Sequence, residues 1–153
     1  MAIIFNQRFE DINVDNLAQV RVALRRGLSS RLSDDFVADM LVGIGEVITN
    51  DLRYGNKGDH PVSIRISLIS SLVNVCIEAN SHMEKRKELS LAIAEAENSK
   101  GCPDFILRDG GLGLHFVSAM STGRIHLHKK WMCYALPLNS QVEEKRRCRA
   151  RVA

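Results

Sequence analysis

Residues 45–56, GEVITNDLRYGN, place a glutamate and an asparagine four positions apart among small and apolar residues. On a helix, residues at i and i+4 project from one face, one turn apart, so Glu46 and Asn50 would be neighbours. Taken alone, the pair is most simply two solvated surface groups, because exposed glutamate is common on helices. The rest of the chain changes that interpretation.

The helix that carries this pair is predicted over residues 33–54. Ser33 is a good N-cap, and the two aspartates that follow it suit the positive end of the helix dipole. The expected buried stripe consists of Val37, Met40, Leu41, Ile44 and Ile48. Glycine inside a helix costs about 1 kcal/mol relative to alanine. Gly43 and Gly45 therefore predict a close approach by another element just before Glu46.

Outward from this helix, the sequence alternates between strand and helix patterns. Strands are expected at residues 3–9, 62–68 and 72–79 and in a last hairpin over 123–138; helices are expected at 16–28, 82–98 and from 112. This order predicts an α+β fold: a two-layer sandwich with a mainly antiparallel sheet and its helices on one face. We expect one domain over residues 1–138 and a basic tail over 139–153.

Composition narrows the function classes. The chain has 153 residues, 45% hydrophobic and 25% charged, which is typical of one globular domain. Membrane insertion is not expected, because no apolar run approaches the roughly 20 residues of a membrane helix, and the start of the chain is expected to be a strand, not a signal peptide. The whole net charge of +3 comes from the tail EEKRRCRAR, and the rest of the chain is neutral. Binding of a nucleic acid through this tail is therefore a minor alternative.

The four cysteines, at positions 76, 102, 133 and 148, include no closely spaced pair. This spacing is typical of neither a zinc ribbon nor a disulfide scaffold, so free thiols in a reducing cytoplasm are expected. Cys76 lies in the middle of a predicted strand and is expected to be a small core residue.

A second informative stretch is DGGLGLHFV at residues 109–117. Gly110, Gly111 and Gly113 allow a partner to approach the backbone closely. They lead into a helix start, whose free N–H groups and positive dipole end favour phosphate. A glycine loop needed only for packing is the alternative.

Together the two stretches resemble the N box and the second glycine-rich box of the Bergerat-type ATPases, which include gyrase, the mismatch-repair ATPases and the sensor histidine kinases. The sequence is most similar to the small anti-sigma-factor serine kinases of bacterial partner-switching systems. Those kinases show Glu-x-x-x-Asn, and Gly-Leu-Gly-Leu before the last helix. The resemblance spans about residues 3–138, and the N box is its more specific part.

The resemblance implies a role for each matching residue. Asn50 would ligate Mg²⁺ through its amide oxygen. Glu46 would be the general base that takes a proton from a protein serine, or from water, attacking the γ-phosphate of ATP. Gly111 and Gly113 would hold the phosphates, Arg108 would pair with their charge, and residues 99–109 would form a lid. The implied partners are a small antagonist protein and a sigma factor or other regulator, and a homodimer through sheet edges or first helices is expected.

One box of the family pattern is missing. The family carries Asp-x-Gly-x-Gly at the end of the second hairpin strand, where the aspartate accepts a hydrogen bond from adenine. Here Ala79 takes the place of that aspartate, and Ser81 and Met83 take those of the glycines. Asn80, one position along, offers an amide oxygen for the same bond. Two hypotheses therefore remain: an active regulatory kinase, or a non-catalytic interaction module on the same fold.

Overall fold

The computed structural model describes residues 1–54, 60–98 and 112–138. These segments form one antiparallel sheet of five strands in the order β1-β2-β3-β5-β4. The strands are β1 (Ala2–Phe9), β2 (Val62–Ile69), β3 (Leu72–Ala79), β4 (Thr122–His128) and β5 (Trp131–Pro137). Buried and half-buried residues alternate along β3 and β5, so each strand turns one row of side chains toward the core.

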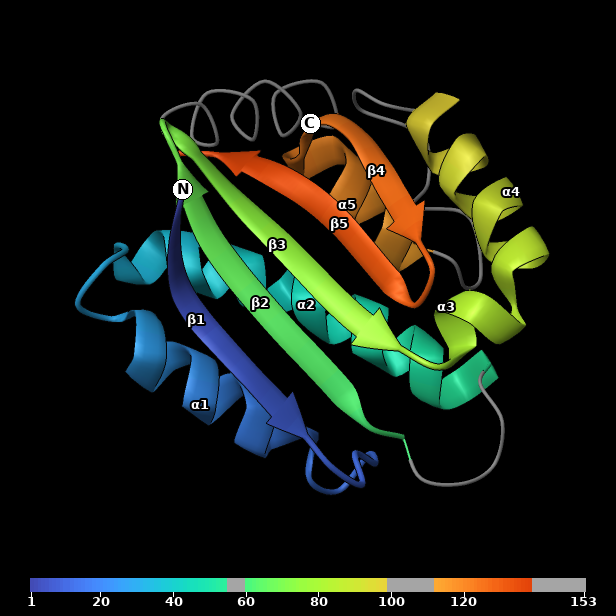
Figure 1. The fold of residues 1–153 in the computed structure, drawn as a ribbon, viewed down its shortest axis with the longest axis horizontal. Helices are drawn as coiled ribbons and strands as arrows, with labels where there is room; N and C mark the ends of the chain where they lie inside the picture. The colour runs from blue at the N-terminus through green and yellow to red at the C-terminus, as the bar shows by residue number, and fades with distance from the viewer. Residues whose placement is uncertain (55–59, 99–111, 139–153) are drawn as a thin grey trace, which may run out of the picture.

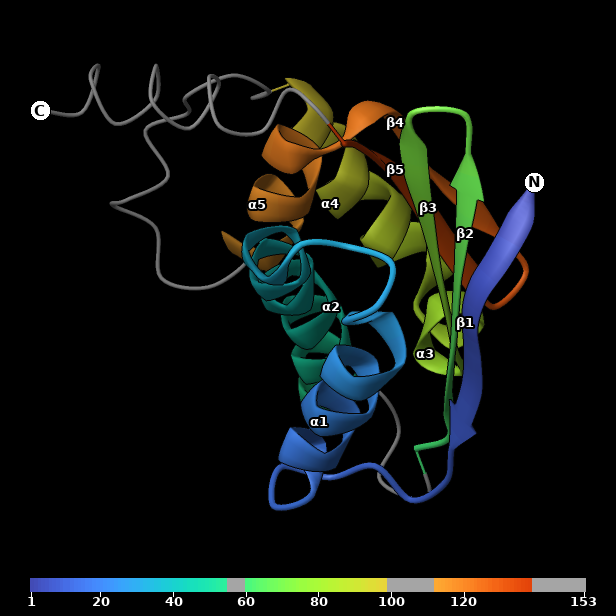
Figure 2. The ribbon, with the colours of Figure 1, turned by 90° about the vertical axis from the view of Figure 1, so that its left-hand side faces the viewer.

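The helices all cover the same face of this sheet (Figures 1 and 2). They are α1 (Leu17–Leu28), α2 (Asp34–Tyr54), α3 (Ser81–Glu84), α4 (Arg86–Asn98) and α5 (Leu112–Met120). Seen along the sheet edge in Figure 2, the helices make one layer and the strands the other. The predicted α+β two-layer sandwich is therefore confirmed.

Helix α2 is the central element of the helical layer. Ser33 caps it, since its hydroxyl accepts a hydrogen bond from the Phe36 N–H at 3.3 Å. The five predicted stripe residues are all buried, in one core with the inward rows of the sheet. Burial of each large aliphatic side chain contributes roughly 1.5–3 kcal/mol, so this stripe fixes the rotation of α2 about its own axis.

The helix predicted over residues 82–98 is divided in two. A single-turn helix, α3, ends at Glu84, and α4 begins at Arg86, with Lys85 between them. The Lys85 N–H donates to the Ser81 carbonyl at 2.8 Å, which closes the short turn. Chain direction therefore changes immediately after β3, and this change places Ser81 and His82 beneath α2.

The prediction of free thiols is wrong for Cys76 and Cys133, which form a disulfide. They are opposite each other in the register of β3 and β5. Their separation of 57 residues concealed this pairing, because only the strand order brings them together. Cys76 is also not a core residue: it is half-buried on the face that carries no helices, while its neighbours Val75 and Ile77 are buried on the other. Cys102 and Cys148 lie outside the described residues.

Membrane insertion finds no support in the helices. Within the segments that the structure describes, none of them is both long and apolar enough to cross a bilayer.

Candidate functional site

Glu46 on α2 lies directly against the first turn of α5. A Cβ atom built on Gly113 would stand 2.6 Å from the Glu46 Cβ and 2.9 Å from its Oε2. No real side chain tolerates that separation, so glycine is required at position 113 for this approach. The glutamate of GEVITNDLRYGN and the glycine of DGGLGLHFV are thus in contact, although 67 positions separate them (113 − 46).

The two glycines inside α2 differ in how closely other residues approach them. A Cβ on Gly43 would meet the end of the Met120 side chain at 3.2 Å and the Tyr134 hydroxyl at 3.4 Å. The predicted close approach is therefore confirmed at Gly43, where α5 and β5 pack against α2. At Gly45 a Cβ would meet only the Arg21 guanidinium, at 3.4 Å, which is ordinary contact.

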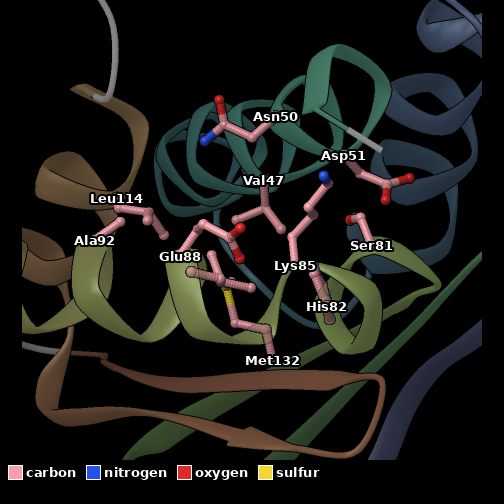
Figure 3. Close-up of a pocket in the computed structure, with 11 residues that line it drawn as sticks. Val47, Asn50, Asp51, Ser81, His82, Lys85, Glu88, Ala92, Leu114 and Met132 are labelled. Carbon is pink, nitrogen blue, oxygen red and sulfur yellow. The ribbon is translucent and has the colours of Figure 1, made fainter. Parts of the chain in front are cut away.

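A cavity of about 320 Å³ lies beside this contact, between α2, α3 and α4, with α5 and β5 contributing to its walls (Figure 3). Its volume lies at the lower end of the range for small-molecule pockets. It is lined by Val47, Asn50, Asp51, Ser81, His82, Lys85, Glu88, Leu89, Ala92, Leu114 and Met132.

The lining divides into apolar walls and polar ends. Val47 from α2, Leu114 from α5 and Met132 from β5 are buried and offer flat apolar contact. The exposed side chains of Lys85 and Glu88 stand on the α4 side, opposite α2 (Figure 3). A purine base suits such walls, since its faces are apolar and its edges carry the polar groups.

His82 is fixed in the wall of the cavity. Its side chain is almost fully buried, and Nδ1 lies 2.8 Å from the Lys130 carbonyl, to which it donates a hydrogen bond. Burial lowers the pKa of His82, and the Lys130 carbonyl and the Asp51 charge offset only part of this effect. At neutral pH the ring is therefore uncharged.

Asp51 is the most unusual polar residue of the site, and the sequence analysis did not single it out. It is 3% exposed, and the His60 ring lies beside it, with Nδ1 3.6 Å from Oδ2. Neither carboxylate oxygen accepts a hydrogen bond from a described residue. The signal was present in the sequence, because Asp51 follows Ile44 and Ile48 at helical spacing and so extends the buried stripe with a charge.

The predicted site residues are placed as follows. Asn50 is half-buried and lines the cavity at the α2 rim, while Glu46 is exposed one turn earlier and is not part of the lining. Asn80 is the N-cap residue of α3 and does not line the cavity, although the next two residues do. Arg108 and Gly111 lie outside the described residues.

The donor groups of α2 are those that Mg²⁺ prefers. Glu46 and Asn50 present a carboxylate and an amide oxygen on one helix face, and Mg²⁺ needs only one or two protein ligands when phosphate oxygens and water complete its shell. No cluster of three or more histidine, cysteine, aspartate or glutamate side chains occurs in the described segments, so a metal site made wholly of such side chains is not found there.

No family model matches this sequence, and no curated protein is significantly similar to it.

Proposed function

We propose that this chain is a regulatory switch protein that binds Mg-ATP and transfers the γ-phosphoryl group to a serine of a small antagonist protein. The observation that carries the proposal is the contact of Glu46 with Gly113 beside a cavity that Asn50 lines. Asn50 of α2 and Leu114 of α5 line this cavity, and Glu46 stands outside the lining, against the first turn of α5.

The chemistry assigned to each residue follows from its position. Glu46 is exposed, so a serine hydroxyl on a second protein can reach its carboxylate, which accepts the hydroxyl proton as the oxygen attacks phosphorus. Asn50 holds Mg²⁺, which neutralises phosphate charge when bound. The first N–H groups of α5 point toward the phosphates, and the apolar walls hold the base.

The proposal includes partners and a location. The antagonist protein is the phosphoryl acceptor, a sigma factor or similar regulator is the second partner, and the protein acts as a homodimer. ATP places this activity in the cytoplasm. Disulfides are rare in that compartment, so alkylation of cells before lysis, followed by a count of free thiols at Cys76 and Cys133, tests the location.

The proposal is tested by calorimetric titration with Mg-ATP and by measuring ADP formation with water as the acceptor. Wild type binds and slowly hydrolyses ATP. Glu46→Gln keeps the affinity but loses hydrolysis by about 100-fold or more, since general-base catalysis contributes 10²–10⁴. Glu84→Gln, which removes an exposed carboxylate of α3, is the matched control and behaves as wild type. Equal hydrolysis by the two variants refutes the assigned role of Glu46.

A non-catalytic interaction module is the second candidate, and the end of β3 favours it. Ala79 is buried, and α3 begins two residues later, where the resemblance expects an aspartate and two glycines. Under this candidate, wild type binds Mg-ATP weakly or not at all and does not hydrolyse it. Formation of ADP by wild type excludes it.

A further inference from the structure

The Cys76–Cys133 disulfide lies on the sheet face that, in the described segments, carries no helices (Figure 2). It joins β3 to β5, which are both inner strands of the sheet. Both cysteines are half-buried. Neighbouring strands cover the backbone of an inner strand, so the exposed part of such a residue belongs mainly to its side chain. A small thiol or peroxide can therefore approach this bond from solvent.

The sheet register places a nitrogen-bearing side chain beside each cysteine. Arg65 of β2 is the cross-strand partner of Cys76, and His126 of β4 is the partner of Cys133. Directly opposite residues of neighbouring strands project from one face, with Cβ atoms about 4.5–5.5 Å apart. One row across four strands, here called the cysteine row, thus consists of Arg65, Cys76, Cys133 and His126.

The surroundings of Cys76 favour negative charge on its sulfur. The Asn74 side chain donates a hydrogen bond from Nδ2 to the Cys76 Sγ at 3.4 Å. The Arg65 guanidinium carbon lies 5.0 Å from the centre of the Trp131 ring. Since Arg65 is on β2 and Trp131 is on β5, the arginine side chain crosses β3 on the face that carries Cys76. A thiolate is stabilised by a nearby cation and by a hydrogen-bond donor, so Cys76 is the better leaving group of the two.

We propose that this pair is a reversible redox site, which a dithiol reductant opens and a hydroperoxide closes while the domain stays folded. In reduction, a thiolate of the dithiol attacks the Cys133 Sγ, the S–S bond breaks, and Cys76 leaves as the thiolate. The second thiol of the reductant then attacks the mixed disulfide and releases Cys133. The two electrons and two protons of the dithiol end on the pair, and the reductant leaves as a disulfide.

Oxidation begins at the same sulfur that leaves in reduction. The Cys76 thiolate attacks an oxygen of the hydroperoxide, the O–O bond breaks, and a sulfenic acid forms while an alcohol or water leaves. The Cys133 sulfur then attacks the Cys76 sulfur, and the S–O bond breaks. The displaced hydroxide leaves as water with the proton of the Cys133 thiol, and His126 is the neighbour in the cysteine row that is placed to carry this proton.

The sheet does not depend on this bond alone. Strands β3 and β5 also share an antiparallel ladder of backbone pairs, and Val75, Ile77 and Met132 bury their side chains in the core on the opposite face. Opening the bond therefore leaves the two strands paired. In the cytoplasm, where the proposed function places this chain, disulfides are usually transient and serve catalysis or redox sensing. The inference otherwise stands apart from nucleotide binding, and its test contains no nucleotide.

The test treats the full chain with millimolar dithiothreitol in native buffer, removes the reductant and adds hydrogen peroxide. Mass spectrometry of peptides counts the thiols at Cys76 and Cys133 after each step, and circular dichroism follows the fold. The bond is expected to open without denaturant, to form again with peroxide, and to leave the spectrum unchanged. A bond that opens only in denaturant, a reduced chain that unfolds, or peroxide products without the disulfide would overturn the proposal.

Single-cysteine variants test the assigned roles. One nearby cation raises the thiolate fraction by about tenfold, and the lower nucleophilicity of that thiolate offsets roughly half of the logarithm. Iodoacetamide at pH 7 is therefore expected to alkylate Cys76 in Cys133→Ser about threefold faster than Cys133 in Cys76→Ser. Arg65→Gln, added to Cys133→Ser, is expected to remove this advantage, whereas Arg26→Gln, on exposed α1, keeps it. Equal rates for the two cysteines, or no effect of Arg65→Gln, contradict the role given to Cys76.

Discussion

Replacing Gly113 with alanine tests the contact between α2 and α5 directly. The added methyl would stand 2.6 Å from the Cβ and 3.3 Å from the Cγ of Glu46. Carbon atoms in contact prefer about 3.5–4.0 Å, so the two helices must separate by roughly 1 Å. The Glu46 Cβ is joined directly to the α2 backbone, and a rotamer change cannot remove it.

The expected magnitude follows from two opposing effects. Overpacking of this kind typically costs about 1–3 kcal/mol. Alanine recovers at most about 1 kcal/mol relative to glycine in a helix. The net loss in the free energy of unfolding is therefore about 1–2 kcal/mol, which lowers the melting temperature by roughly 3–6 °C in a domain of this size.

Gly45→Ala is the matched control, because it makes the same chemical change in α2. There the new methyl meets only the end of the Arg21 side chain, at 3.4 Å. The helix propensity gain of up to about 1 kcal/mol then dominates, and the melting temperature rises. Urea unfolding followed by circular dichroism measures both variants. Destabilisation at position 45, or an unchanged protein with alanine at position 113, refutes the packing described here.

Other expected results concern single buried groups. Because the pKa of His82 is lowered in the folded protein, the native state binds fewer protons than the unfolded state below about pH 6.5. The stability that the uncharged ring contributes is therefore complete above that pH and is lost as the pH falls toward the folded pKa, by at most about 1.4 kcal/mol per pH unit. Urea unfolding of His82→Gln at a series of pH values should show a shallower loss of stability toward low pH. The Cys76–Cys133 disulfide closes a loop of 57 residues and contributes up to about 4 kcal/mol of stability by restricting the unfolded chain. Cys133→Ser should therefore lower the midpoint of unfolding relative to wild type in oxidising buffer and have little effect in the presence of a reductant. Equal effects in both buffers would contradict the bond. The Tyr134 hydroxyl is buried without a hydrogen-bond partner among the described residues, so Tyr134→Phe should be neutral or stabilising by about 1 kcal/mol; a loss above 1 kcal/mol would reveal a partner.

The element order was predictable because each element carries a local signal. The stripe of α2 repeats every three to four residues, and β2 and β3 alternate on either side of a short turn. The break at Lys85 contains no glycine or proline, so no residue there predicts the end of a helix. Register pairs such as Cys76 and Cys133 depend on β5 lying next to β3, which is a property of the whole sheet.

The candidate site was predictable where residues share one helix. Glu46 and Asn50 are related by helical spacing, and Gly113 was expected to face them from a later helix. Asp51 was not recognised as a site residue because its neighbour Asn50 matched a known pattern and Asp51 did not. Its importance depends on burial and on the absence of donors around it among the described residues, and these follow from tertiary packing.

The most direct test of the central claim is a titration of the ¹⁵N-labelled protein with Mg-ATP, observed by two-dimensional NMR. If nucleotide binds between α2, α3 and α4, saturable shifts occur at the amides of Asn50, Asp51 and Ala92. The groove between β1 and α1, lined by Gln7 and Ala23 among others, serves as the internal control and stays unchanged. Shifts confined to that groove, or none at millimolar Mg-ATP, would contradict the account.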